Sequence, residues 1–116
     1  MSYEKHGRGM IAVNLVHNFL IKQGYQVFSE DQSQGMVDMV AINEDGDMML
    51  IDVKALARRS DGTKINRVLR PNQKKLEDAL NTKIQLIYAD VDTGEIDFNR
   101  RKSYEKNRKR YMAFQS

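Results

Sequence analysis

The stretch VDMVAINEDGDMMLIDVK, residues 37–54, constrains the fold most strongly. Two apolar runs, residues 37–42 and 48–56, flank a polar segment with an Asp-Gly pair, and this pattern is typical of a β-hairpin. Side chains alternate between the two faces of a strand. The second strand is therefore expected to bury Met49, Ile51 and Val53 and to present a mostly polar opposite face.

Charged side chains interrupt both apolar runs. Asp38 lies in the first run, and Asp52 and Lys54 share the polar face of the second. A turn centred on the Asp-Gly pair would place Asp38 near Val53, within reach of Asp52 across the hairpin. We therefore expect the two carboxylates and the ammonium group to lie close together.

Two converging carboxylates repel each other, which raises a pKa unless a cation lies between them. Mg²⁺ meets this need because it prefers oxygen ligands and accepts one or two carboxylates. Such an ion lowers the pKa of bound water and stabilises charge on a phosphate, while Lys54 could position the attacking water or neutralise the phosphorane. This set suits phosphodiester hydrolysis. The alternative is a solvated salt bridge between Lys54 and Asp38 or Asp52.

The remaining pattern predicts an α/β fold. A helix is expected at residues 8–23, and a second helix begins at Pro71 and buries a stripe of Leu76, Ala79 and Leu80. Further strands are expected at residues 25–29, 84–90 and 96–98, and the basic residues 57–70 are interpreted as a mobile loop. The order α-β-β-β-α-β-β implies a small mixed sheet flanked by helices.

Length and composition limit the class of protein. The chain has 116 residues, enough for one domain, and it contains no cysteine, which excludes disulfides and thiolate metal sites. No apolar run has the length of a membrane span, and the N-terminal residues lack an apolar signal core. We expect a cytoplasmic protein with no membrane segment.

The charge distribution is asymmetric. Residues 1–57 carry four Lys/Arg and eight Asp/Glu, a net charge of −4, whereas residues 58–116 carry fifteen and eight, a net charge of +7. Basic blocks favour a polyanionic partner such as DNA, although a solvated surface is the alternative. The candidate DNA-binding residues are Arg58, Arg59, Lys64, Arg67, Arg70, Lys74, Lys75, Arg100, Arg101 and Lys102.

Asp38, followed by Asp52-Val53-Lys54, resembles the motif of PD-(D/E)XK nucleases. Within that superfamily the chain is most similar to the archaeal-type Holliday junction resolvases, through GMIAVNLVHNFLIKQGYQVF, VDMVA and IDVK, over roughly residues 5–90. The resemblance implies a restriction-endonuclease-like core, α-β-β-β-α-β, in a domain at residues 1–99. A basic C-terminal tail, residues 100–116, follows it.

The resemblance also implies roles for individual residues. Asp38 and Asp52 would bind Mg²⁺, or Mn²⁺ as a substitute, helped by the backbone carbonyl of Val53, and Lys54 would be catalytic. Gln73 would hold the metal-bound water or a phosphate; the alternative is an exposed helix glutamine. Ser33 would lie near the scissile phosphate; the alternative is an ordinary loop serine.

One residue of the resolvase pattern is absent. Those nucleases carry a metal-associated glutamate on the first helix, and the matching position here is Val13, which cannot ligate a metal. Asn14 is adjacent, and His17 lies one turn further on and could coordinate a metal or shuttle a proton. A lone helix histidine is more often a partly buried packing residue, and Glu4 could fold in instead.

The leading expectation is a Mg²⁺-dependent DNA endonuclease that resolves Holliday junctions in DNA recombination and repair. Symmetric cuts need two active sites, so a homodimer acting on branched or duplex DNA is implied. The alternatives are another nuclease of this superfamily, with nicking, flap or restriction-like activity, and a DNA-binding protein that does not cleave.

Overall fold

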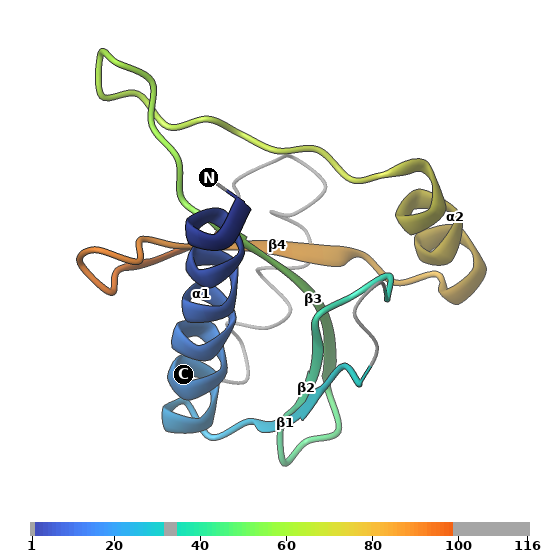
Figure 1. Ribbon diagram of the computed structural model, residues 1–116. Helices are drawn as coiled ribbons and strands as arrows, with labels where there is room; N and C mark the ends of the chain where they lie inside the picture. Colours follow the sequence, from blue (N-terminus) through green and yellow to red (C-terminus); the bar gives the residue numbers. More distant parts are fainter. Residues whose placement is uncertain (1, 32–34, 99–116) are drawn as a thin grey trace.

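The computed structural model describes residues 2–31 and 35–98 and contains two helices and five strands in those ranges. These are α1 (Ser2–Lys22), β1 (Gln26–Ser29), β2 (Met39–Ile42), β3 (Met48–Ala55), α2 (Pro71–Leu80), β4 (Ile84–Ala89) and β5 (Ile96–Phe98). Figure 1 shows this order, which confirms the predicted α-β-β-β-α-β-β arrangement. The proposed tail, residues 100–116, with Arg100, Arg101 and Lys102, lies outside the described residues, as does Ser33.

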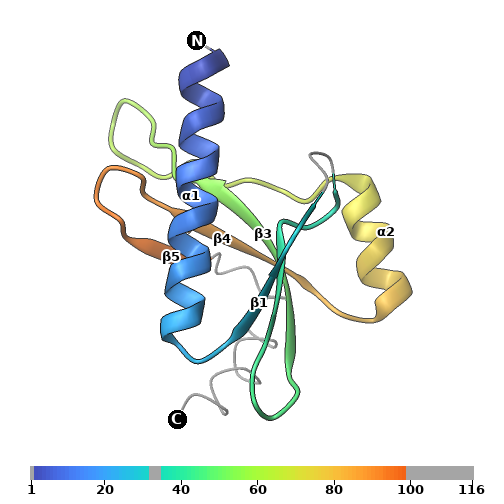
Figure 2. The same cartoon turned by 60° about the horizontal axis from the view of Figure 1, so that its bottom comes forward.

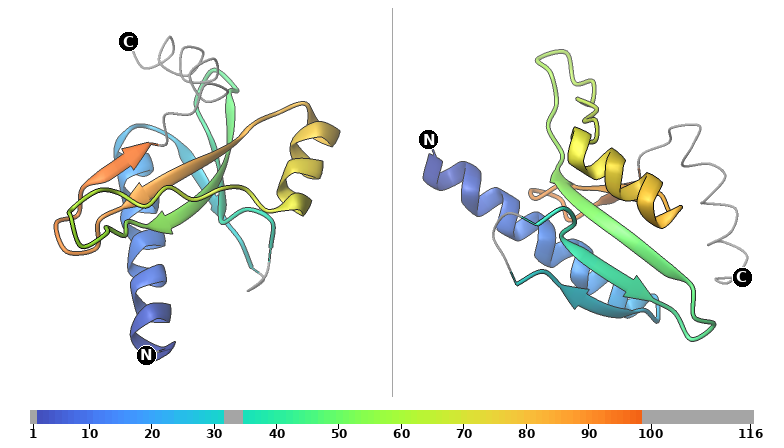
Figure 3. Two further views of the ribbon diagram at one scale, coloured as in Figure 1. Left: turned by 90° about the horizontal axis from the view of Figure 1, so that it is seen from above. Right: turned by 90° about the vertical axis from the view of Figure 1, so that its right-hand side faces the viewer.

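The strands form one mixed sheet in the order β1-β2-β3-β4-β5. Neighbouring strands are antiparallel except for the central pair, β3 and β4, which are parallel and joined by a crossover that contains α2. The two helices lie on opposite sides of the sheet, as the views in Figures 2 and 3 show. The predicted α/β class with a small mixed sheet flanked by helices is therefore confirmed.

Both faces of β3 are covered. Met49, Ile51 and Val53 pack with α1 in one apolar cluster, as predicted. Leu50 faces the other way, into a second cluster with Leu69, Ile84, Leu86 and Tyr88. The face that carries Asp52 is thus partly a second core, where the alternation pattern predicted a mostly polar face. Central parallel strands are buried on both sides, which explains the difference.

The β2–β3 hairpin has a register one residue away from the predicted one. Met39 lies opposite Ile51, and Ile42 opposite Met48, so the turn comprises residues 43–47 and centres on Asp45. The side-chain oxygen of Asn43 accepts the backbone N–H groups of Asp45 (3.0 Å) and Asp47 (2.9 Å). The turn residues are the predicted ones, 43–47, and this local bonding centres the turn on Asp45 and not on the Asp45-Gly46 pair.

Helix α2 buries polar side chains rather than the predicted apolar stripe. Gln73 and Glu77 are buried, whereas Ala79 and Leu80 are exposed and Leu76 is only half-buried. Glu77 accepts the backbone N–H of Ile84 at 2.6 Å, which ties the helix to the start of β4. Hydrogen bonds to the sheet therefore dock this short helix together with the packing of Leu76.

The basic segment after β3, predicted to be a loop at residues 57–70, contains no helix or regular strand, but its first part forms a hydrogen-bonded hairpin. Its base pairs the N–H of Ile65 with the carbonyl of Ala57 at 2.9 Å. Its tip pairs the N–H of Arg59 with the carbonyl of Thr63 at 2.8 Å, and Gly62 adopts a positive φ of 90°. We call residues 57–65 the basic hairpin; Figure 1 shows it projecting from the sheet.

Helix α1 lies along the sheet face opposite α2. Ala12, Val16 and Leu20 are fully or almost fully buried against the sheet, and Val13 packs against the same cluster. Neither of the helices in the described part of the chain is apolar enough over a sufficient length to cross a membrane.

Candidate active site

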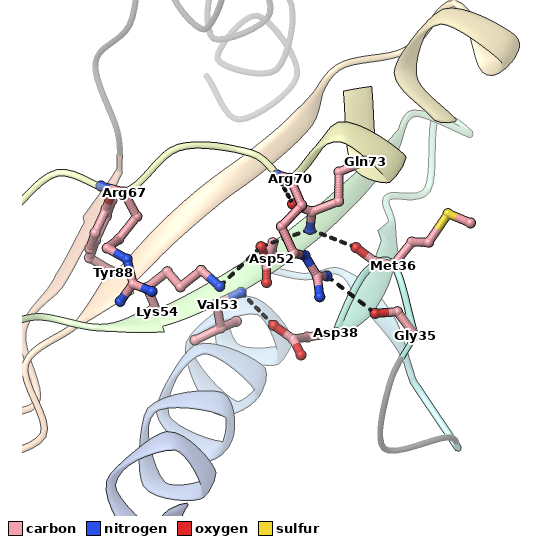
Figure 4. Close-up of polar contacts among 10 residues, drawn as sticks. All are labelled: Gly35, Met36, Asp38, Asp52, Val53, Lys54, Arg67, Arg70, Gln73 and Tyr88. Carbon is pink, nitrogen blue, oxygen red and sulfur yellow. Dashed lines mark hydrogen bonds and ion pairs between the residues drawn. The ribbon is translucent and has the colours of Figure 1, made fainter. Parts of the chain in front are cut away.

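A polar cleft of about 360 Å³ lies between β3, the segment before β2 and the start of α2. Figure 4 shows the side chains that meet there. The lining includes all three residues of the predicted cluster. The lining residues are Glu30, Gly35, Asp38, Asp52, Val53, Lys54, Arg70 and Asn72.

Asp52 occupies the floor of the cleft on β3 and is only 5% exposed. Its Oδ2 accepts a hydrogen bond from Nε2 of Gln73 at 2.9 Å and lies 3.4 Å from Nζ of Lys54. A carboxylate this buried needs such partners, because desolvation strongly disfavours an unpaired charge. The predicted proximity of Asp52 and Lys54 on one face of β3 is therefore present.

Asp38 precedes β2 and points its carboxylate at the neighbouring strand. Its Oδ2 accepts the backbone N–H of Val53 at 2.6 Å, while its own N–H donates to Ile51 at 2.8 Å. Burial raises the pKa of Asp38 to about 6; the nearby Asp52 and Glu30 carboxylates also raise it, and the Val53 N–H opposes the shift. The carboxylate thus reaches Val53, as predicted, despite the different strand register.

Gln73 is buried and hydrogen-bonded to three segments of the chain. The alternative interpretation from the sequence, an exposed helix glutamine, is therefore wrong. The side chain is 1% exposed, and its Nε2 donates to Asp52 and also to the carbonyl of Met36, at 2.8 Å. Its Oε1 accepts the backbone N–H of Arg70 at 2.8 Å. One amide therefore joins β3, the segment before β2 and the first turn of α2.

Among the described basic residues, Lys54 and Arg70 line the cleft. Lys54 is half-buried, and the guanidinium of Arg70 donates to the carbonyl of Gly35 at 3.4 Å. The other described candidates for DNA contact are exposed but lie outside the cleft lining: Arg58, Arg59, Lys64, Arg67, Lys74 and Lys75. Lys64 also forms an ion pair with Asp97 on β5.

Helix α1 contributes no residue to the cleft within the described ranges. Val13, at the position of the expected glutamate, packs against the apolar cluster on the other sheet face. Asn14 is exposed and His17 half-buried, and neither lines the cleft. The structure therefore does not bring Asn14 and His17, the candidate ligands on α1, into the cleft that the carboxylates line.

Glu30 and Asn72 line the cleft but were not identified from the sequence. Glu30 follows β1, and its backbone N–H donates to the carbonyl of Asp38 at 3.0 Å. The sequence did contain a signal for Glu30. This acid directly follows the strand β1, and the antiparallel pairing of β1 with β2 places it opposite Asp38. The loop position of Glu30 concealed this pairing, because loop acids are common.

The donor set fits a hard divalent cation such as Mg²⁺. Asp38 and Asp52 supply carboxylate oxygens to one polar cleft, and the Asp52 carboxylate adds to the effect of burial in raising the pKa of Asp38. Among the residues that the structure describes, no group of three or more His, Cys, Asp or Glu side chains has a metal-binding arrangement. A bound ion would thus rely on two carboxylates and on water.

The comparisons with known proteins find a similar solved structure but no similar sequence family. No family model and no curated protein matches this sequence. A bacterial homing endonuclease, I-Ssp6803I, has a similar solved structure, with a TM-score of 0.56 at 15% sequence identity. The similarity covers 79% of this chain and 62% of that endonuclease chain. This chain therefore spans less than two thirds of the length of that structural neighbour. The chain therefore shares the core fold of an endonuclease.

Proposed function

We propose that this protein is a metal-dependent DNA endonuclease. The observation that carries the proposal is the convergence of Asp38, Asp52 and Lys54 on one polar cleft of about 360 Å³. The fold shared with a homing endonuclease supports it, as does the basic half of the chain. Phosphodiester hydrolysis uses this combination of two acids and a nearby cation.

Each side chain has a distinct role in the proposal. Asp38 and Asp52 would hold Mg²⁺, which when bound would supply charge to stabilise the phosphate and to acidify a water. Lys54, held 3.4 Å from Asp52, would orient the attacking water or stabilise negative charge on the phosphate. Gln73 fixes the Asp52 carboxylate and thereby the direction of its free oxygen.

The proposed substrate is branched DNA, cut as a four-way junction by a homodimer. This finer proposal rests on the resemblance of the VDMVA and IDVK motifs to junction resolvases. Duplex DNA is the second substrate to consider, because the structural neighbour is a homing endonuclease. Paired symmetric nicks require two active sites related by a two-fold axis.

One experiment tests both substrates. The protein is incubated with a four-way junction, a sequence-matched duplex and a flap, with Mg²⁺ or with EDTA. Paired nicks on the junction that appear with Mg²⁺ but not with EDTA support junction resolution. Cuts that appear only on the duplex would instead favour a site-specific nuclease. Binding without cleavage in any metal, unchanged by Asp52→Asn, would eliminate both.

A non-cleaving DNA-binding protein is the second candidate function. It is favoured by the packing of Val13 against the apolar core and by the finding that no three His, Cys, Asp or Glu side chains of the described residues form a metal-binding group. The same incubation separates this candidate from the first, because a binding protein shifts the junction in a gel but leaves its strands intact.

A further inference from the structure

Residues 66–70 connect the basic hairpin to α2 and reach the cleft at Arg70, and the segment is anchored at three points. The N–H of Arg67 donates to the hydroxyl of Tyr88 at 2.6 Å. Leu69 is 4% exposed and packs in the apolar cluster beneath α2. The N–H of Arg70 donates to Gln73 at 2.8 Å. The segment is therefore held in one conformation against the sheet.

Apart from Leu69, the side chains of residues 67–70 are exposed. Val68 is 78% exposed, the largest fraction among the exposed large hydrophobic residues of the described chain, and arginines precede and follow it in the segment. Two exposed arginines on one anchored segment suit contacts with phosphate and sugar, which position a protein on a nucleic-acid backbone. We call residues 67–70 the ridge; it ends at Arg70 in the cleft lining.

Tyr88 ties this ridge to the catalytic strand. Its ring is buried in the apolar cluster, and it lies directly beside Lys54 in the parallel pairing of β3 and β4. Figure 4 shows Tyr88 beneath Arg67 and close to Lys54. Because adjacent strands are separated by a fixed spacing of about 4.8 Å, the bond to Arg67 sets the position of the ridge relative to Lys54.

We infer that Tyr88 is a positioning residue for DNA binding: its hydroxyl holds the Arg67–Arg70 ridge in the conformation that contacts the DNA backbone beside the cleft. The inference rests on the proposed function, since it assigns the substrate contact of the same site. The buried ring serves the core, and the hydroxyl serves the ridge. Removal of the hydroxyl alone therefore separates the two roles.

The central test is Tyr88→Phe, which keeps the buried ring and removes the acceptor for the Arg67 amide. The expected result is a DNA dissociation constant, measured in EDTA, that rises about fivefold, the factor for one typical net hydrogen bond. KM is expected to rise by the same factor while kcat at saturating DNA stays within about twofold. A variant that only destabilised the fold would have a lower melting temperature but would not combine a raised KM with an unchanged kcat.

A protease assay reports on the ridge without DNA. Trypsin cleaves after Arg67 once the segment opens, whereas Arg70 is protected by the following Pro71. Tyr88→Phe is expected to speed the cut after Arg67 several-fold, with the sites in the basic hairpin unchanged as internal controls. If Tyr88→Phe fails to fold, Arg67→Pro and Arg67→Ala replace it: both remove the side chain, but only proline removes the N–H that donates to Tyr88.

The outcomes are distinct for the two proposals. Unchanged DNA affinity and unchanged trypsin cleavage in Tyr88→Phe, or equal effects of Arg67→Pro and Arg67→Ala, overturn the positioning role alone. A loss confined to kcat overturns it as well, because Tyr88 would then act on the chemistry. A wild-type protein that binds none of the DNA substrates overturns the proposed function, and the DNA role of Tyr88 with it.

Discussion

The Asp52 carboxylate receives an amide on one side and an ammonium group on the other, both at its Oδ2 atom. This arrangement leaves Oδ1 free of these two contacts, so the second oxygen can face the cleft that Asp38 also lines. Lys54 is therefore positioned both to neutralise a buried charge and to act on a group bound in the cleft. Substitution separates these roles.

Lys54→Ala is expected to lower the cleavage rate by at least about 10²-fold, because one positioned charge in an active site contributes that much to the rate. Junction binding should stay within a few-fold, measured by fluorescence anisotropy in EDTA. Lys83→Ala, at an exposed lysine before β4, is the matched control and should cleave normally. Equal losses of binding and cleavage would instead make Lys54 a phosphate anchor.

The raised pKa of Asp38 predicts a pH-dependent stability. The folded protein holds this proton up to about pH 6, whereas the unfolded chain releases it near its ordinary value of 3.8, so the contribution to stability falls as pH rises between them. Asp38→Asn stays neutral and still offers an oxygen to the Val53 N–H. The melting temperature of wild type relative to this variant, in EDTA, should therefore fall by a few degrees from pH 4 to pH 7. A pH-independent difference would contradict the buried, crowded environment of Asp38.

At the scale of elements, α2 is attached to the sheet by its polar side chains. Gln73 serves three partners in three segments, and Glu77 accepts the first N–H of β4. The orientation of α2, and with it the placement of Arg70 at the cleft, depends on these bonds. The two glutamines that are buried in the described part of the chain, Gln73 and Gln85, offer a matched test of this dependence.

Gln73→Met keeps the side-chain volume but leaves Asp52, the Met36 carbonyl and the Arg70 N–H without their amide partner. We expect a loss of about 2–4 kcal/mol in the free energy of unfolding, because buried groups left unsatisfied carry their full desolvation cost. Gln85→Met is the control: Gln85 is 1% exposed, and neither its Nε2 nor its Oε1 has a hydrogen-bond partner within the described structure. This variant should be neutral or more stable in urea unfolding. A comparable loss at both positions would refute the linking role of Gln73.

The sequence was sufficient to predict the elements and the carboxylate–lysine cluster, because periodicity and the Asp-Gly turn are local signals. It could not predict the docking of α2: Gln73 and Glu77 are buried by long-range bonds to Asp52 and Ile84, and no local pattern encodes these. Glu30 was missed for a different reason: it follows β1 in a loop, where acidic residues are common. The predicted hairpin register is wrong by one residue because the bonds to the Asn43 side chain centre the turn on Asp45 and not on the Asp45-Gly46 pair.

At the scale of the whole molecule, the charge asymmetry predicts that the proposed DNA binding depends strongly on salt. Exposed basic residues lie on the basic hairpin, the ridge and α2, and one of them, Arg70, lines the cleft. Phosphate contacts release counterions, so the logarithm of the association constant should fall linearly with the logarithm of salt concentration. Such contacts give affinity with little dependence on base sequence.

Lys74→Ala, on α2 near the cleft, is expected to reduce the magnitude of this salt slope by about one, as for the loss of one phosphate contact. Lys22→Ala is the control, because Lys22 ends α1 on the other side of the sheet. Its slope should match that of wild type. Titrations at four salt concentrations measure both slopes, and identical values for the two variants would place α2 outside the DNA-binding surface.

The parallel pairing of β3 with β4 has a consequence for biosynthesis. β3 is made long before its partner, because residues 56–83 separate them, so it is an unpaired sheet edge while the chain is completed. A run of Met, Leu, Ile and Val on such an edge invites aggregation, and Asp52 and Lys54 are the charges that interrupt it. The proposed catalytic residues therefore also act as gatekeepers in the nascent chain. Apolar replacements at these two positions are expected to lower the yield of soluble protein on expression, an effect that is independent of any change in activity.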